Sequence, residues 1–199
     1  MAELACQHLG QRIKTLLNSQ YEQILERDDW VSEIVEILAR LADQPPDCYI
    51  YILLDPRKLP TDEESNVQDW EEAVRNAAFY PGMGQGNRIH THQKAKTGEP
   101  RYQRMREIIT AERGYLAIKV LEGVSKFIAL QLEGLLIRSW PVGHLTKRNG
   151  GSASKILKGE LERQCAMQLQ EWAIKGILKK DLKRSAELPF LGGDGLFPQ

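Results

Sequence analysis

The amino-acid sequence predicts an α/β fold of the α+β kind: a small three-stranded sheet, mixed or antiparallel, flanked by helices. Three short runs are rich in β-branched and aromatic residues, which is typical of strands. The segments around them repeat apolar residues at helical spacing. Glycine and proline lie in most of the connections between these predicted strands and helices. A helical hairpin at the N-terminus and a helix at the C-terminus are added to the sheet region.

The N-terminal region, residues 3–43, repeats leucine, isoleucine and valine at helical spacing, and Pro45 and Pro46 end it. We expect a helical hairpin that packs on the rest of the chain or binds a protein partner or a second copy. The predicted domains are residues 1–46, a central domain at 47–154, and a basic helix with a flexible tail at 155–199. Within the last domain we expect the helix at 155–185.

The central domain begins with a buried strand at residues 48–54, which Asp55 and Pro56 stop. An acidic insertion at 57–78 follows, and a second short strand at 77–80 leads into a glycine loop. We expect helices at 88–96 and 102–113 and a third strand at 115–121. A last helix at 125–140 has Ser125 as its N-cap, and Pro141 ends it.

The composition indicates a soluble, reduced protein. The chain has 199 residues, 42% of them hydrophobic, which suffices for one core. No apolar run approaches the about 20 residues that span a bilayer, and the first residues lack a secretory signal. Three widely separated cysteines indicate packed thiols. We therefore expect a cytoplasmic location without membrane association.

The charges divide the chain into two halves. Residues 1–75 hold 7 Lys and Arg against 16 Asp and Glu, whereas residues 76–199 hold 20 against 11. A basic half of this size suits a polyanion, because Lys and Arg contacts release counterions from a phosphate backbone. Ordinary solvated helix faces would give the same count, so this alternative stays open.

The segment 79–92 places a tyrosine, an arginine and two histidines around Gly82, Gly84 and Gly86. Glycines let a backbone approach a ligand closely, and arginine and histidine suit a phosphate that is held and then cut. A nucleotide-binding loop is disfavoured, since the lysine and hydroxyl residue of a P-loop are missing. We expect this segment to be the working site.

Five residues combine into a hypothesis of phosphodiester hydrolysis with one divalent metal. They are Tyr51, Tyr80, Arg88, His92 and Glu133. Arg88 and His92 are four residues apart and would share a helix face. Two alternatives stay open: the tyrosines are plain core residues, or Glu133 pairs with Arg138 or Lys126 on the surface.

The same residues carry a resemblance to a known family. Residues 49–56, 80–88 and 104–109, in this order and followed by Glu133, resemble the GIY-YIG nuclease domain. The likeness is closest to the subgroup in LEM-domain, ankyrin-repeat nucleases and their bacterial relatives, and it covers about residues 48–150. The fold class given above agrees with this domain.

The resemblance implies a metal-dependent endonuclease that cuts DNA rather than RNA, with branched or otherwise structured DNA among the expected substrates, to 5′-phosphate and 3′-hydroxyl ends. Tyr51 and Tyr80 would line the site and orient or deprotonate water, Arg88 would clamp the phosphate, and His92 would be the general base. Glu133 would be the sole protein ligand of Mg²⁺ or Mn²⁺. Supporting residues are Asn149, Gly82, Gly84 and Gly86, and substrate contacts are Arg101, Arg104, Lys147 and Arg148.

Three residues depart from the family pattern, and one of them, Met83, favours an alternative together with the acidic insertion at 57–78. Tyr49 replaces the first glycine, Pro81 replaces a β-branched residue, and Met83 replaces a lysine that would bind phosphate. Proline donates no N–H, so we expect Pro81 on an edge strand. The alternative is a weak or inactive nucleic-acid-binding or partner-binding module that keeps the fold.

Overall fold

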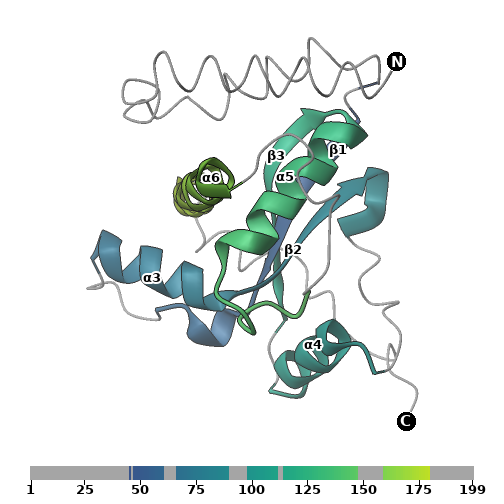
Figure 1. Cartoon of the computed structure of the whole chain (residues 1–199). Coiled ribbons are helices and arrows are strands. Elements are labelled where there is room, and N and C mark those ends of the chain that lie inside the picture. Colours follow the sequence, from purple (N-terminus) through teal and green to yellow (C-terminus); the bar gives the residue numbers. More distant parts are fainter. Residues whose placement is uncertain are drawn as a thin grey trace.

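The fold was determined as a computed structural model that describes residue 45 and residues 47–60, 66–89, 98–111, 114–147 and 159–179. It confirms the predicted class, because a three-stranded antiparallel sheet is covered by helices (Figure 1). The hairpin predicted at 3–43 and the tail at 188–199 lie outside the described residues. None of the described helices is long and apolar enough to cross a membrane.

The sheet has β1 (Cys48–Leu54) at its centre, between β2 (Ala78–Gln85) and β3 (Leu116–Val124). All seven residues of β1 are buried, because both faces of the strand are covered, and such strands lack polar alternation. β2 is an edge strand of this sheet, and Pro81 lies on it opposite Ile52. The edge position expected for this proline is confirmed.

One face of the sheet carries the larger core, beneath α3 (Val67–Ala77), α5 (Lys126–Ser139) and α6 (Gly159–Lys179). The predicted cap of α5 is confirmed, because the Ser125 hydroxyl accepts from the Ile128 N–H at 3.4 Å. α3 lies in the acidic insertion and is tied to α6, where Arg75 contacts Glu171 at 2.8 Å. The helical part of the insertion, α3, therefore belongs to the packed domain.

The other face carries a smaller, tyrosine-rich core beneath α4 (Pro100–Thr110). α4 supplies Met105 and Ile108, which pack with Tyr49, Tyr51 and other buried residues of this face. The helix begins at Pro100, two residues before the predicted start, because a proline in the first turn lacks only an N–H that would have no helical partner. β3 also runs further than predicted, to Val124.

The glycine segment differs from the predicted loop. β2 does not end at residue 80 but continues to Gln85, so that Gly82 and Gly84 are strand residues. Of the three glycines only Gly86 has a positive φ, at 53°, and it begins a single 3-10 turn at residues 86–89. The remainder of the helix predicted at 88–96 lies outside the described residues.

Candidate active site

Two tyrosines meet on the tyrosine-rich face of the sheet. The ring centroids of Tyr51 on β1 and Tyr80 on β2 lie 6.4 Å apart, with 28° between the planes. Gly82 lies opposite Tyr51, and a Cβ built on it would lie 2.4 Å from the Tyr51 hydroxyl oxygen. The glycine is therefore needed to make room for the ring. The expectation that Gly82 and Gly84 lie in a loop is wrong, because both lie on β2.

Arg101, in the first turn of α4, joins this pair. Its Nη1 donates to the Tyr80 hydroxyl oxygen at 3.1 Å, and its guanidinium carbon lies 4.9 Å from the Tyr80 ring centroid. Glu99 holds the other end of the guanidinium, with Nη2 at 2.8 Å from the carboxylate. The Tyr80 oxygen thus accepts a charge-assisted hydrogen bond.

Tyr49 holds the turn that carries Arg88. Its hydroxyl donates to the Gly86 carbonyl oxygen and accepts from the Ile89 N–H, both at 2.9 Å. Arg88 lies between these two contacts and is exposed. The sequence flagged Tyr49 only as a departure from the family pattern. The spacing of two residues between Tyr49 and Tyr51 could have indicated its role, because it places both side chains on the same face of the sheet. On that face Tyr49 reaches the glycine segment.

Glu133 is buried in α5, with 4% of its surface exposed. Its Oε1 accepts from the backbone N–H of Met83 at 2.9 Å and from Nζ of Lys147 at 2.7 Å. The alternative of a surface pair is wrong, since Arg138 pairs with Glu162 at 2.6 Å instead. Met83, whose side chain lacks the expected charge, thus supplies its backbone to the site.

The electrostatics of Tyr51 show which groups surround its phenol. Burial raises the pKa of Tyr51 first of all, and the neighbouring Tyr80 and Glu133 raise it further. The positive charges of Arg88 and Arg101 act in the opposite direction. Distances place the same groups together, because Tyr80 contacts Tyr51, Arg101 and Lys147, and Lys147 pairs with Glu133. The raised pKa keeps the phenol protonated at neutral pH.

A hard divalent cation fits this site through one carboxylate. Both protein bonds to Glu133 end on Oε1, so Oε2 has no hydrogen-bond partner within the described part of the chain. Mg²⁺ keeps several waters and takes phosphate oxygens as further ligands, so one carboxylate suffices. The described ranges contain no group of three or more His, Cys, Asp or Glu that would build a fuller metal cage.

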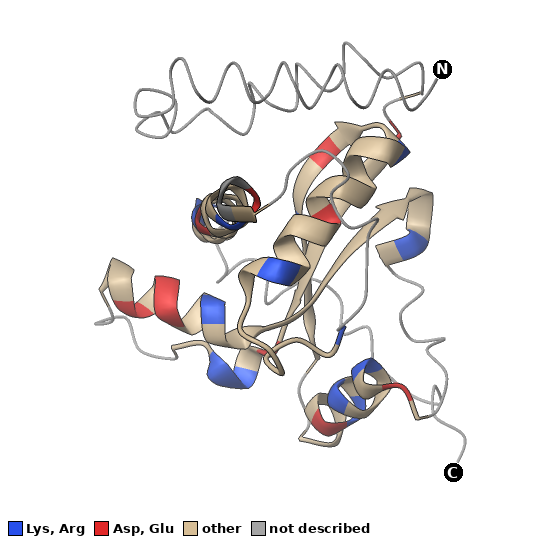
Figure 2. Ribbon diagram, in the orientation of Figure 1, with Lys and Arg blue, Asp and Glu red and all other residues tan. Residues whose placement is uncertain are grey.

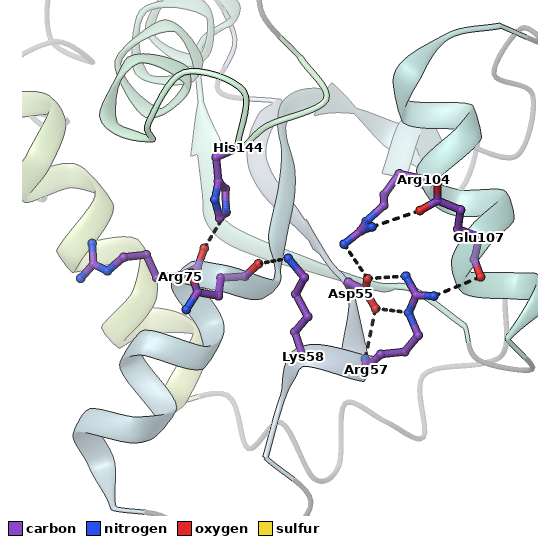
Figure 3. Close-up of polar contacts among 8 residues, drawn as sticks. Asp55, Arg57, Lys58, Arg75, Arg104, Glu107 and His144 are labelled. Atoms are coloured by element: carbon purple, nitrogen blue, oxygen red, sulfur yellow. Dashed lines mark hydrogen bonds and ion pairs between the residues drawn. The ribbon is translucent and has the colours of Figure 1, made fainter.

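The remaining predicted residues are placed differently. Lys147 lies in the site, on Glu133, whereas His92, Arg148 and Asn149 lie outside the described residues. Arg104 lies at the other end of the tyrosine-rich face, where it contacts the buried carboxylate of Asp55 at 3.0 Å (Figure 3). The structure therefore does not bring Arg104 together with Tyr51 and Glu133.

Comparison with known proteins agrees with this geometry. The model of the LEM-3-like GIY-YIG domain matches residues 48–180, more than half of the chain. The chain belongs to this GIY-YIG family. The resemblance drawn from the sequence is confirmed, and the domain is of a nuclease type whose members generally use divalent metals. Curated proteins and solved structures give no match to the chain.

Proposed function

We propose that this GIY-YIG domain is a metal-dependent endonuclease that hydrolyses phosphodiester bonds of DNA to 5′-phosphate and 3′-hydroxyl ends. The observation that carries the proposal is the contact of Tyr80 with Tyr51, with Arg101 and with Lys147, the ion-pair partner of Glu133. Arg88 lies nearby on the turn that Tyr49 holds. Cations for a phosphate, phenols that donate hydrogen bonds and one carboxylate for a metal are the parts that such a reaction needs.

Each group has a role in the reaction. A water oxygen attacks the phosphorus, the bond from phosphorus to the 3′-oxygen breaks, and the leaving oxygen gains a proton. Arg88, exposed on a turn that Tyr49 holds, is suited to bind the phosphate oxygens. Tyr51 is suited to orient water rather than to deprotonate it, because its pKa is raised. His92 is then the proposed general base. A Mg²⁺ or Mn²⁺ ion on Glu133 would stabilise charge on the leaving 3′-oxygen.

DNA as the substrate is supported by the distribution of charge. Arginines mark α4, whereas three acidic residues lie in the first half of α3 (Figure 2). The first turn of α4 lies beside the site, because Arg101 donates to Tyr80. Arg101 therefore offers a contact for a phosphate that flanks the cut.

A Mg²⁺-dependent cleavage assay tests the proposal. Glu133→Gln should lose at least about a hundredfold in rate, on the order of 3 kcal/mol of barrier. Glu122→Gln is the matched control, because Glu122 is exposed and pairs only with Lys119 at 2.8 Å among described residues. The panel should contain linear, supercoiled and branched DNA, and RNA. Equal cleavage by the parent and Glu133→Gln would refute the site assignment.

A second candidate is a DNA-binding or partner-binding module without catalysis. One observation favours it: Lys147, 2.7 Å away, already neutralises the carboxylate of Glu133 that would bind the metal. The same assay separates the two candidates. DNA binding without cleavage of any substrate in the panel would support the module.

A further inference from the structure

Glu133 and Lys147 form an ion pair that is shielded from solvent. Nζ of Lys147 lies 2.7 Å from Oε1 of Glu133, and the side chains are 20% and 5% exposed. Nζ also lies 5.1 Å from the centroid of the Tyr80 ring. The ammonium thus occupies the position between the carboxylate and a tyrosine of the site.

The chain after α5 holds Lys147 in this position. The N–H and hydroxyl of Thr146 both donate to the carbonyl oxygen of Phe79, at 2.8 and 3.0 Å. Leu145 is buried in the larger core. Lys147 follows these two anchors directly, so its reach to Glu133 is set by β2 and not by a mobile surface segment.

A buried carboxylate needs a cation, and an ammonium and a divalent ion cannot both lie against it without repelling each other. Oε1 already accepts two protein donors. We propose that Lys147 is the internal counter-ion of Glu133 in the free protein and that it opposes binding of a divalent cation there. This inference rests on the proposed function, since it concerns the metal of the same site.

The proposal also couples metal binding to substrate binding. When the divalent ion takes Glu133, the ammonium of Lys147 needs another anion, and a DNA phosphate held at Tyr80 and Arg101 would supply it. Metal and DNA should therefore each strengthen the binding of the other, and by the same factor. A neutral side chain at position 147 removes this coupling.

Mn²⁺ serves as the probe, with water-proton relaxation titrations on the full chain. Lys147→Met should bind Mn²⁺ at least about tenfold more tightly than the parent, or 1.4 kcal/mol. Lys147→Met combined with Glu133→Gln should lose that gain. Lys126→Met, an exposed lysine at the start of the same helix as Glu133, should bind like the parent. Equal or weaker Mn²⁺ binding by Lys147→Met, or no binding by any variant, would overturn the proposal.

Thermal unfolding shows whether a change in Mn²⁺ binding results only from loss of folding. Without metal, Lys147→Met should melt below the parent, because Glu133 loses its cation, and Mn²⁺ should raise its melting temperature more than the parent's. Lys147→Gln should behave in the same way. Tighter Mn²⁺ binding together with a parent that cuts no substrate would keep this inference and refute the nuclease. Cleavage by the parent, together with an unchanged Mn²⁺ affinity of Lys147→Met, would refute this inference and keep the nuclease proposal.

Discussion

Gly84 lies directly opposite Tyr49 across β2 and β1, and a Cβ on Gly84 would lie 2.7 Å from the tyrosine ring. The same relationship joins Gly82 and Tyr51. The alternating glycines of β2 therefore leave room for the rings of two tyrosines on β1. They support the site by leaving room for the two tyrosine rings beside the edge strand.

Gly84→Ala should destabilise the protein by about 2 kcal/mol, because an added methyl group in a packed position forces backbone or ring to move. Urea unfolding followed by tryptophan fluorescence measures this change. Gly176→Ala is the control: nothing lies within 4 Å of its Cβ position, and it lies in α6, so the exchange should stabilise by about 0.5–1 kcal/mol. Equal effects at both positions would contradict the packing role.

Tyr49→Phe should lower both the cleavage rate and the stability of the protein. The ring would still fill its place, but the turn carrying Arg88 would lose both contacts to the hydroxyl, at a cost of about 1–2 kcal/mol. Cleavage should fall at least about tenfold, mainly through kcat, because Arg88 is no longer held in position.

Tyr115→Phe is the matched control for this exchange. Its hydroxyl is buried without a hydrogen-bond partner among the described residues, and burial above all raises its pKa to about 12. Removing an unsatisfied hydroxyl should leave stability unchanged or improve it. A loss of activity from Tyr115→Phe as large as that from Tyr49→Phe would show that Tyr49 has no special role.

The elements that could be predicted from sequence are those with local signals. The apolar run of β1 and the serine cap of α5 act within a few residues, and both are confirmed. The glycine segment was predicted wrongly, because glycine indicates backbone freedom but not which neighbour fills the space beside it. That neighbour is Tyr49 or Tyr51, more than 30 residues away in the case of Gly82 and Gly84.

Residues of the site could be predicted from the sequence, but the contacts between them could not. Burial of Glu133 follows from the apolar residues around it in α5, whereas its pairing with Lys147 depends on how the chain after α5 returns to Phe79. Arg101 and Arg104 look equivalent in sequence. Only the packing of α4 separates them, because one reaches Tyr80 and the other Asp55.

Arg101→Gln and Arg104→Gln should therefore behave differently. Arg101→Gln should slow cleavage at least about tenfold and lower the slope of log affinity against log salt by about 1. Arg104→Gln should lower stability by about 1 kcal/mol, through its contact to Asp55, and leave the slope unchanged. DNA binding measured at several salt concentrations tests this pair. Identical salt slopes for both variants would refute the difference.

Asp55 links stability to pH at the end of β1. It is fully buried and accepts from Arg57 Nε at 2.9 Å and Nη2 at 2.7 Å, while Arg104 lies 3.0 Å away (Figure 3). Burial alone would raise the pKa of Asp55, but the hydrogen bonds and charge of Arg57, together with Arg104, outweigh it and lower the pKa. The folded state therefore prefers the carboxylate.

Asp55→Asn should cost about 2–3 kcal/mol at pH 7, less than a fully buried pair, because the side chains of Arg57 and Arg104 are 31% and 27% exposed. A carboxyl whose pKa is lowered on folding stabilises above its unfolded pKa of about 3.9, and this contribution is lost as the pH falls through the folded pKa. The difference in the free energy of unfolding between the parent and Asp55→Asn should stay constant from pH 7 to 5 and shrink below about pH 4. Urea titrations at pH 7, 5, 4 and 3 measure it, with the exposed Glu72→Gln as a control. A difference that persists unchanged at pH 3 would mean that the amide disturbs packing, and that the charge of Asp55 contributes nothing.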